Sequence, residues 1–392
     1  LGSATPDVAT YSRARNNEHK LLEMPNRIPG TKLSTQSRSS FKPPPKVQVV
    51  DMRKELREGN RSIFSRFLVT ALQQTVAEGY QSLLFINRRG ASTHVQCRDC
   101  GSTQRCQRCA VTLTYHVSLD RLVCHQCGRR TGVPSACPMC WGNRIRFLGI
   151  GTQRVVEAVQ ELFPQVAILR WDQDAVSRLN THHLLGERFQ KGEAQILVGT
   201  QMIAKGLDFK NVTLVGIINA DSGLFFPDFR AGEHVFQLIY QVSGRAGRRH
   251  KPGRAIIQTY NPEDIYIQTA SALNTQKFYN IALAQRRELN YPPFSRIGRI
   301  LFTGGNKLIV NNFAQMVGRK LQGNPNYKIL GPVSAPIEKI RGNWRIHLII
   351  KTKNRKISGL HQFLQSTIGF TIFERKWRGV RIQIDVDPVS ML

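Results

Sequence analysis

Cys97-Arg-Asp-Cys100, Cys106-Gln-Arg-Cys109, Cys124-His-Gln-Cys127 and Cys137-Pro-Met-Cys140 are four Cys-x-x-Cys pairs, and they hold all eight cysteines of the 392-residue chain. Two thiolates separated by two residues can reach one metal ion from a tight turn, and Zn²⁺ takes four such sulfurs in a tetrahedron. The four pairs therefore predict two closed zinc sites. Because neither site has a spare ligand position, we expect both ions to be structural.

Other interpretations of these cysteines fit the chain less well. Disulfide scaffolds are usually short secreted chains, and a redox Cys-x-x-Cys motif does not occur in four copies. His94, His116 and His125 lie near the cysteines and are alternative ligands, although eight sulfurs already fill two tetrahedra. Trp141 follows the last cysteine; we expect it to pack on a small core around the metals, with stacking on a nucleic-acid base as the alternative.

The pairing of the cysteines follows from how an insertion must be built. If the inner four cysteines share one ion and the outer four share the other, the two ends of the segment come together, as insertion into another domain requires. We therefore assign Cys97, Cys100, Cys137 and Cys140 to the first zinc and Cys106, Cys109, Cys124 and Cys127 to the second, within an insert at residues 95–142.

The composition favours a polyanionic partner. Lys and Arg number 56 against 26 Asp and Glu, which gives a formal net charge of +30. Such a surface binds phosphates strongly, with a steep dependence on salt. No apolar run reaches the length of a membrane span, so we expect a cytoplasmic protein without a membrane partner. The chain does not begin with Met, and we expect it to be a fragment of a longer protein.

The pattern around the insert indicates an α/β fold. Strand-like apolar runs alternate with helical periodicities, which favours a parallel sheet with helices on both faces. The expected strands are 82–86, 166–169, 195–198, 213–218 and 254–258. The expected helices are 65–78, 152–162, 182–189 and 232–240.

The remaining segments complete the expected domains. Residues 1–60 are polar and irregular and are read as a connector with a short apolar strand at 47–50, and residues 61–272 as the α/β lobe. From residue 275 to 392 the pattern changes to that of a small α+β domain of split βαβ type. Its expected strands are 299–302, 345–350 and 380–386, and its expected helices are 308–321 and 357–368.

Two segments of the α/β lobe carry polar side chains in positions suited to phosphate chemistry. The first, 196–209, runs from a strand into a loop with Thr200, Lys205, Gly206 and Asp208, and ligands bind beyond the carboxyl ends of parallel strands. The second is Gln241-Val-Ser-Gly-Arg245-Ala-Gly-Arg248. Guanidinium groups are well suited to charge that develops on a transferring phosphoryl group. Solvated basic side chains remain the alternative for each arginine.

The order of these segments carries a family resemblance. Gly2-Ser-Ala-Thr-Pro6 and the two segments above resemble motifs III, V and VI of superfamily 2 helicases. With the cysteine block, the chain resembles the primosomal protein N′ (PriA) family of replication-restart helicases. The further segments on which this resemblance depends are Asn87-Arg-Arg-Gly90, Asp228-Phe-Arg230, Tyr291-Pro-Pro-Phe294 and the terminal 385–392.

The resemblance implies roles for particular residues. Gln241, Arg245 and Arg248 would line the nucleotide cleft, with one arginine acting as the arginine finger. Gly206 and Asp208 would lie on the nucleotide side of the loop. Thr200 and Lys205, together with Arg88 and Arg89, would contact the DNA strand.

The resemblance also implies partners and an activity. The family unwinds DNA 3′ to 5′ with ATP and Mg²⁺ and reloads the replisome at forks in the bacterial cytoplasm, at the nucleoid. Branched or forked DNA with single-stranded arms, primosome proteins and single-stranded-DNA-binding proteins would be the partners. Residues 1–60 would include the end of the first helicase lobe, and the RecA-like second lobe (61–272) would carry the zinc insert.

One departure limits what the chain alone is expected to do. The sequence contains neither Gly-x-x-x-x-Gly-Lys-Ser/Thr nor an acidic Mg²⁺ motif, both of which belong to the first lobe in the family. We expect the 392 residues to be inactive as an ATPase, with ATP and Mg²⁺ bound mainly through the missing lobe. The alternatives are a non-catalytic zinc-containing nucleic-acid-binding scaffold and an RNA-directed member of the superfamily.

Overall fold

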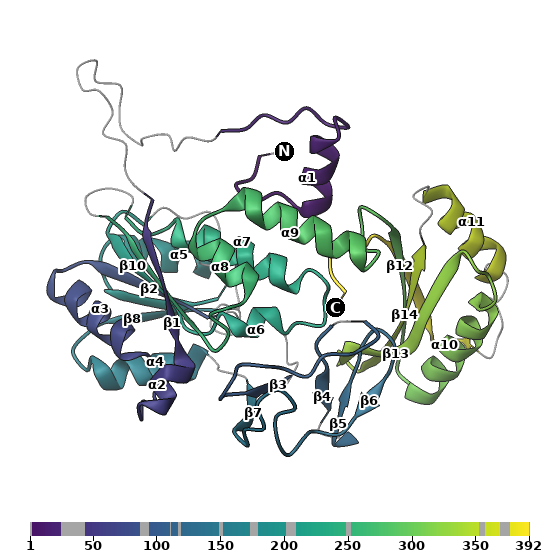
Figure 1. Cartoon of the computed structure of the whole chain (residues 1–392), viewed down its shortest axis with the longest axis horizontal. Helices are drawn as coiled ribbons and strands as arrows, with labels where there is room; N and C mark the ends of the chain where they lie inside the picture. The colour runs from purple at the N-terminus through teal and green to yellow at the C-terminus, as the bar shows by residue number, and fades with distance from the viewer. Residues whose placement is uncertain are drawn as a thin grey trace. The chain divides into compact units, whose positions relative to one another are not determined.

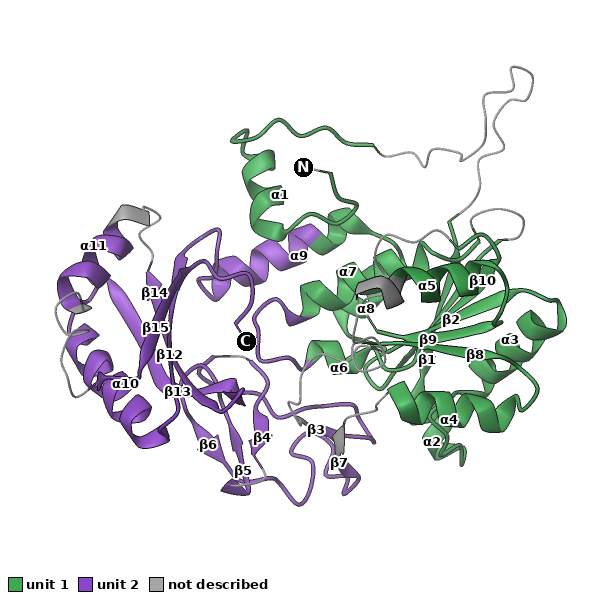
Figure 2. Ribbon diagram, turned by 180° about the vertical axis from the view of Figure 1, so that it is seen from behind, with its two compact units in different colours: residues 1–88, 149–224, 232–278 green, residues 89–148, 225–231, 279–392 purple. Residues whose placement is uncertain are grey.

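The computed structural model divides the chain into two compact units, each of which is described by itself (Figure 2). Unit 1 comprises residues 1–88, 149–224 and 232–278, and unit 2 comprises residues 89–148, 225–231 and 279–392. The residues whose structure is described are 2–24, 44–86, 94–109, 111–116, 119–148, 152–172, 179–200, 209–247, 252–352, 357–368 and 377–391. Across these ranges no helix combines the length and apolarity needed to cross a membrane.

Unit 1 is built on a six-stranded parallel sheet, as the alternating pattern predicts (Figure 1). The strand order is β1-β11-β10-β2-β9-β8. The strands are β1 (Lys46–Asp51), β2 (Gln81–Phe85), β8 (Ile168–Trp171), β9 (Ile196–Gly199), β10 (Val212–Ile217) and β11 (Arg254–Thr259). β1 pairs in register with β11, so the strand that we assigned to the connector forms the edge of this sheet.

Helices cover both faces of the sheet, with α3 and α4 on one side and α5, α7 and α8 on the other (Figure 1). The predicted helices correspond to α3 (Arg66–Ala77), α4 (Thr152–Leu162), α5 (Leu179–Gln190) and α7 (Ala231–Ser243). Those not expected are α1 (Val8–Arg15), α2 (Met52–Arg57), α6 (Asp221–Leu224), α8 (Ile265–Ser271) and α9 (Thr275–Glu288). These helices and strands confirm the α/β fold class.

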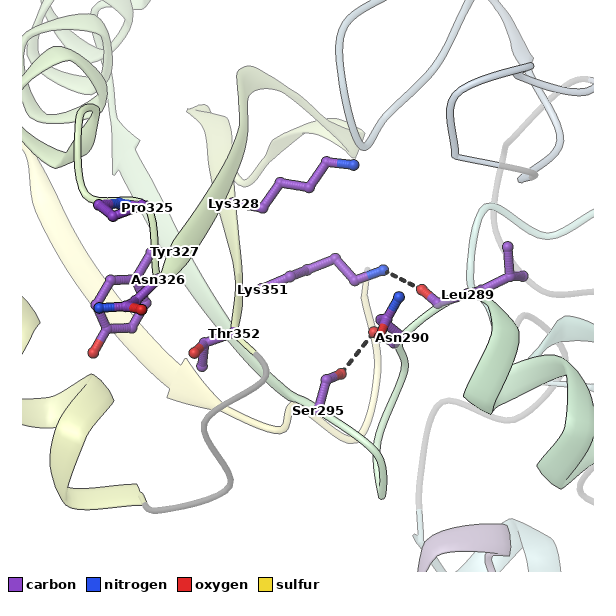
Figure 3. A pocket seen from close by; sticks show the side chains of 9 residues that line it. All are labelled: Leu289, Asn290, Ser295, Pro325, Asn326, Tyr327, Lys328, Lys351 and Thr352. Atoms are coloured by element: carbon purple, nitrogen blue, oxygen red, sulfur yellow. Dashed lines mark hydrogen bonds between the residues drawn. The ribbon is translucent and has the colours of Figure 1, made fainter.

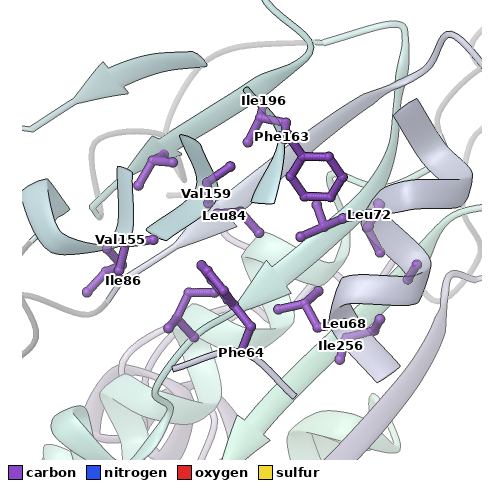
Figure 4. Close-up of a cluster of buried hydrophobic side chains, with 14 residues drawn as sticks. Phe64, Leu68, Leu72, Leu84, Ile86, Val155, Val159, Phe163, Ile196 and Ile256 are labelled. Atoms are coloured by element: carbon purple, nitrogen blue, oxygen red, sulfur yellow. The ribbon is translucent and has the colours of Figure 1, made fainter. Parts of the chain in front are cut away.

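Helix α3 shows how the sequence specifies one of these elements. The Ser65 hydroxyl accepts a hydrogen bond from the Leu68 amide at 3.1 Å, which caps the helix start. Gly79, with φ +72°, follows the helix end. Leu68 and Leu72 face the sheet and are fully buried. They pack with Phe64, Leu84 and Ile256 in the core between α3, α4 and the strands (Figure 4).

Unit 2 contains the predicted split βαβ domain. The elements follow one another as β12 (Arg296–Gly304), α10 (Lys307–Leu321), β13 (Tyr327–Ile340), β14 (Asn343–Thr352), α11 (Ile357–Ile368) and β15 (Arg381–Val386). The four strands form an antiparallel sheet in the order β13-β14-β12-β15. In this βαββαβ order each helix connects two strands that are not hydrogen-bonded neighbours, which is the split arrangement.

The cysteine-rich insert, which we call the zinc module (residues 94–148), also lies in unit 2. Its ends are joined by an antiparallel ladder between β3 (His94–Cys97) and β7 (Ile145–Leu148). A second sheet holds β4 (Thr114–His116), β5 (Arg121–Val123) and β6 (Arg130–Thr131). The two ends of the insert therefore lie side by side, as we expected for an insertion whose cysteine pairs are nested.

Candidate functional site

The outer four cysteines form one cluster. Cys97 Sγ lies 3.7 Å from Cys140 Sγ, and Cys100 Sγ lies 3.6 Å from Cys137 Sγ. Four sulfurs held about 2.3 Å from one Zn²⁺ in a tetrahedron are about 3.8 Å apart. A disulfide would need about 2.05 Å. The donor set and the spacing therefore fit a zinc ion and exclude a disulfide here.

The inner four cysteines form the second cluster, as nested pairing predicts. Cys106 Sγ is 3.6 Å from Cys127 Sγ, and the ligand atoms of Cys106, Cys109, Cys124 and Cys127 all lie within 4.8 Å of one another. Three of the four are buried, and they belong to the core of the module with Val95, Leu113 and Leu122. The metal site is thus part of the hydrophobic core of the module.

The turns that carry the cysteines share one backbone geometry. An amide one residue past the second cysteine donates to the carbonyl of the first: Gly101 to Cys97, Gly128 to Cys124 and Trp141 to Cys137, at 2.8–2.9 Å. All three donors have positive φ, at +81°, +78° and +60°. Glycine takes this conformation without strain, whereas a side chain in it costs roughly 1–2 kcal/mol.

The four thiols of one site can all be deprotonated together only when a cation is bound. Burial raises the pKa of Cys97 to about 12, and the hydrogen bond with Cys124 raises the pKa of Cys109 far above its usual value. A bound dication reverses this effect, because it stabilises every coordinating thiolate. At each site a Zn²⁺ ion would join two of the Cys-x-x-Cys turns, and it would carry out no reaction.

Trp141 differs from what we expected. Its side chain is 81% exposed, so the expectation that it packs on the core of the module is wrong. The neighbouring Met139 is 75% exposed. A large aromatic residue therefore stands in solvent on a strained backbone beside the outer metal site. Its positive φ belongs to the metal-binding turn, because Gly101 and Gly128 share it in the equivalent positions.

His116 and His125 do not join either cysteine cluster, and the side chain of His94 lies outside the described part of the structure. His125 Nδ1 donates to the Ser334 carbonyl at 2.8 Å, so its Nε2 accepts from His116 Nε2 at 3.0 Å. His116 Nδ1 lies 3.1 Å from a Glu338 carboxylate oxygen. His347 Nε2 donates to the His125 carbonyl. These contacts fasten the zinc module to strands β13 and β14, a role that the sequence did not reveal.

Burial keeps two of these histidines neutral. It lowers the pKa of His125 to about 4 and that of His347 to about 3. Gly128 lies on the same seam, where a Cβ would come 2.8 Å from a methyl group of Val333. A glycine is thus required there both for its φ and for the close approach of β13.

In unit 1 the structure brings two of the helicase-like segments together. Gln241 Nε2 donates to the Thr5 hydroxyl at 3.1 Å, and Gln237 Nε2 donates to the Thr5 carbonyl at 3.3 Å. Thr5 is 4% exposed and belongs to the Gly2–Pro6 stretch, more than 200 residues away in sequence. This contact links the segments that resemble motifs III and VI.

The other predicted motor residues are only partly described. Thr200 directly follows β9 and is buried, and its amide donates to the Trp171 carbonyl at 3.3 Å. Arg245 is half-buried just past the end of α7. The remaining predicted residues lie outside the described ranges: Lys205, Gly206, Asp208, Arg248, Arg88 and Arg89.

Three sequence segments singled out for the resemblance meet in unit 2. Phe229 stacks on Tyr291 with ring centroids 4.2 Å apart, and the Arg230 guanidinium lies 4.4 Å from the Phe229 centroid. Arg230 donates to the carbonyls of Pro388 and Val389. We call the set Asp228, Phe229, Arg230, Tyr291 and 388–391 the C-terminal latch.

The latch also reaches the zinc module. The Tyr291 hydroxyl donates to the Gln126 side-chain oxygen at 3.2 Å, and the Met391 amide donates to the Asp228 carboxylate at 3.1 Å. Gln126 lies between the cysteines of the third pair. One polar and aromatic cluster therefore joins the zinc module, the segment 225–231 and the chain's last described residues.

Comparison with known proteins agrees with these features. Three family models match: the primosomal protein N C-terminal domain at residues 287–389, the helicase conserved C-terminal domain at 180–250, and the PriA DNA helicase Cys-rich region domain at 106–131. Replication restart protein PriA of Bacillus subtilis (strain 168) is 42% identical over 394 residues, which covers 100% of this chain and 47% of that protein. The chain belongs to the PriA family.

Other PriA relatives give the same coverage. The PriA of Synechocystis is 41% identical over 100% of this chain and 46% of its own length, and that of Treponema pallidum is 37% identical over 100% and 57%. The chain thus spans about half the length of these PriA proteins. The eight cysteines and the residues of the C-terminal latch lie within the matched length.

Proposed function

We propose that the chain is the C-terminal part of an ATP-dependent 3′ to 5′ DNA helicase that recognises stalled or branched forks and reloads the replisome. The main support is a match to PriA relatives along the whole chain, joined to two clusters with the geometry of four-cysteine zinc sites. Working in the bacterial cytoplasm at the nucleoid, it would bind DNA, primosome proteins and single-stranded-DNA-binding proteins.

Within this proposal, unit 1 supplies half of a nucleotide cleft. Gln241, Arg245 and Arg248 would face ATP, with an arginine stabilising the charge that develops on the transferred phosphoryl group. Thr200, Lys205, Gly206 and Asp208 would transmit the state of the nucleotide to the DNA. The contact between Gln241 and Thr5 supports this assignment, because it joins two motif-like segments at one position.

We expect the 392 residues to bind fork DNA but to show no DNA-stimulated ATP hydrolysis. They contain no pattern for a phosphate-binding loop, whereas the +30 charge favours binding to a polyanion. ATPase assays would compare the chain with the full-length protein, in which Arg245→Ala is expected to lower kcat by at least tenfold. ATP hydrolysis by the 392 residues, or full activity in Arg245→Ala, would contradict the division of roles.

The zinc module is expected to contribute to DNA binding through Trp141. Base stacking on an aromatic side chain is worth about 1–3 kcal/mol, so Trp141→Ala should raise the Kd for single-stranded DNA roughly 5- to 150-fold. Trp141→Phe should keep most of the affinity. Fluorescence anisotropy with a labelled oligonucleotide would measure both variants.

A glycine at the same position separates stacking from folding. Trp141→Gly removes the ring and also relieves the backbone strain at φ +60°, so it should weaken DNA binding while raising the thermal stability of the module. Unchanged affinity in Trp141→Ala and Trp141→Gly would show that the ring does not contact DNA.

A further inference from the structure

A cavity of about 480 Å³ opens in unit 2 (Figure 3). Its wall is formed by the turn after α9, the start of β13 and the end of β14. Its lining residues include Asn290, Ser295, Lys328 and Lys351. Cavities of this size accept ligands as large as a nucleotide.

The two lysines that line the cavity are direct neighbours across the sheet. Lys328 of β13 and Lys351 of β14 are Cα partners in the ladder. Both side chains extend the same way from the strands in Figure 3. Like charges opposite each other on neighbouring strands destabilise a sheet. Repulsion between the two lysines therefore lowers the stability of the fold, and a bound anion would relieve that repulsion.

Lys351 is held in place rather than free in solvent. Its ammonium donates to the Leu289 carbonyl at 3.0 Å and lies 3.7 Å from the centroid of the Tyr291 ring. Burial, together with the charge of Lys328, lowers its pKa to about 8. Neither lysine forms an ion pair with a carboxylate within the part of the chain that the structure describes.

The turn after α9 adds a neutral donor to this wall. Asn290 adopts φ +52°, a conformation that asparagine tolerates better than most residues. Its carbonyl accepts from the Ser295 hydroxyl at 2.6 Å, which fixes the turn. The Asn290 side-chain amide lies on the same side of the cavity as the Lys351 ammonium (Figure 3). Ammonium and amide donors on one wall are suited to the oxygens of an oxyanion.

We propose that this cavity binds a phosphomonoester. A phosphomonoester carries about −1.5 to −2 charges at pH 7 and offers three acceptor oxygens, which matches two ammonium groups and an amide. A phosphodiester inside a strand has one negative charge and two flanking nucleotides. The grouping of these donors on one wall favours a terminal phosphate, from either a nucleic-acid strand end or a free mononucleotide.

The inference does not depend on helicase activity, since every lining residue lies in the C-terminal part of unit 2. Calorimetry with the full chain at about 0.15 M salt, where the Debye length is about 8 Å, would compare four probes. AMP is paired with adenosine, and a 5′-phosphorylated oligonucleotide is paired with the same oligonucleotide bearing a 5′-hydroxyl. We expect at least tenfold tighter binding of the phosphorylated member of one pair or both.

Variants assign the effect to the cavity. Lys328→Ala, at an exposed position, and Lys351→Ala should each abolish most of the preference for the phosphorylated probe. Lys277→Ala removes an exposed lysine of α9 outside the cavity and should leave the preference unchanged. Thermal unfolding of each variant would show whether the fold is retained, and Lys328→Ala keeps the test valid if Lys351→Ala is unstable.

The probes also separate the two sources. A preference with AMP indicates a free mononucleotide, and a preference with the oligonucleotide alone indicates a strand end; both support the proposal. Equal affinity for phosphorylated and unphosphorylated probes overturns it. An equal loss in Lys277→Ala overturns it as well, because the preference would then reflect only the overall charge of the chain.

Discussion

Substituting Cys124 with serine is expected to release the inner zinc ion and unfold the zinc module. Structural zinc sites contribute about 10–16 kcal/mol of apparent binding free energy at neutral pH, and that free energy is folding free energy. Cys124 is fully buried and lies in the core of the module with Cys106, Cys109 and Leu122. With so few apolar residues beside the sulfurs, the core cannot hold the module without the metal.

Metal content and hydrogen exchange would test this expectation. Zinc per chain should fall from two to one or fewer in Cys124→Ser, and amide protection over residues 94–148 should be lost. Ser135→Ala, at an exposed position of the same module, is the matched control and should retain both ions. The α3–α4 core of unit 1 contains no cysteine and should stay protected. Two retained ions would contradict the ligand assignment.

The fold of unit 1 was accessible from the sequence because its elements are locally consistent. Each of the six strands is a short apolar run, and α3 has a capping serine, apolar positions at helical spacing and a terminating glycine. The cysteine pairing was equally accessible, since metal geometry and closure of an insertion depend on spacing alone.

The elements that the sequence missed lack such local signals. β13 contains Gly331, Pro332 and Pro336, which are unfavourable in strands, and its pairing with β14 shifts register around them. The seam through His116, His125 and His347 depends on contacts more than 200 residues apart in the chain. Trp141 was misplaced because no local signal distinguishes a tryptophan that packs on a small core from one that is exposed, as this residue is.

Substituting Arg230 with alanine is expected to detach segment 388–391 from the rest of unit 2. Arg230 is 8% exposed, and its guanidinium donates to the carbonyls of Pro388 and Val389 beside the buried Asp228 carboxylate. Removing one partner of a buried ion pair leaves the other charge uncompensated, at a cost of about 3–5 kcal/mol. Two backbone carbonyls would also lose their donors.

Limited proteolysis and thermal unfolding would measure this loss. In Arg230→Ala the segment 388–391 should become the earliest cleavage site, and the melting temperature of unit 2 should fall by several degrees. Arg230→Lys keeps the charge but not the planar pair of donors, so it should restore only part of the stability. Arg378→Ala, at an exposed position, is the control.

The C-terminal latch explains why segments 228–230 and 291–294 occur together with segment 388–391. Phe229 and Tyr291 form a stacked pair of rings, and this pair orients the Arg230 guanidinium. A stable Arg230→Ala protein with a protected C-terminus would show that the stacked rings hold the segment without the guanidinium.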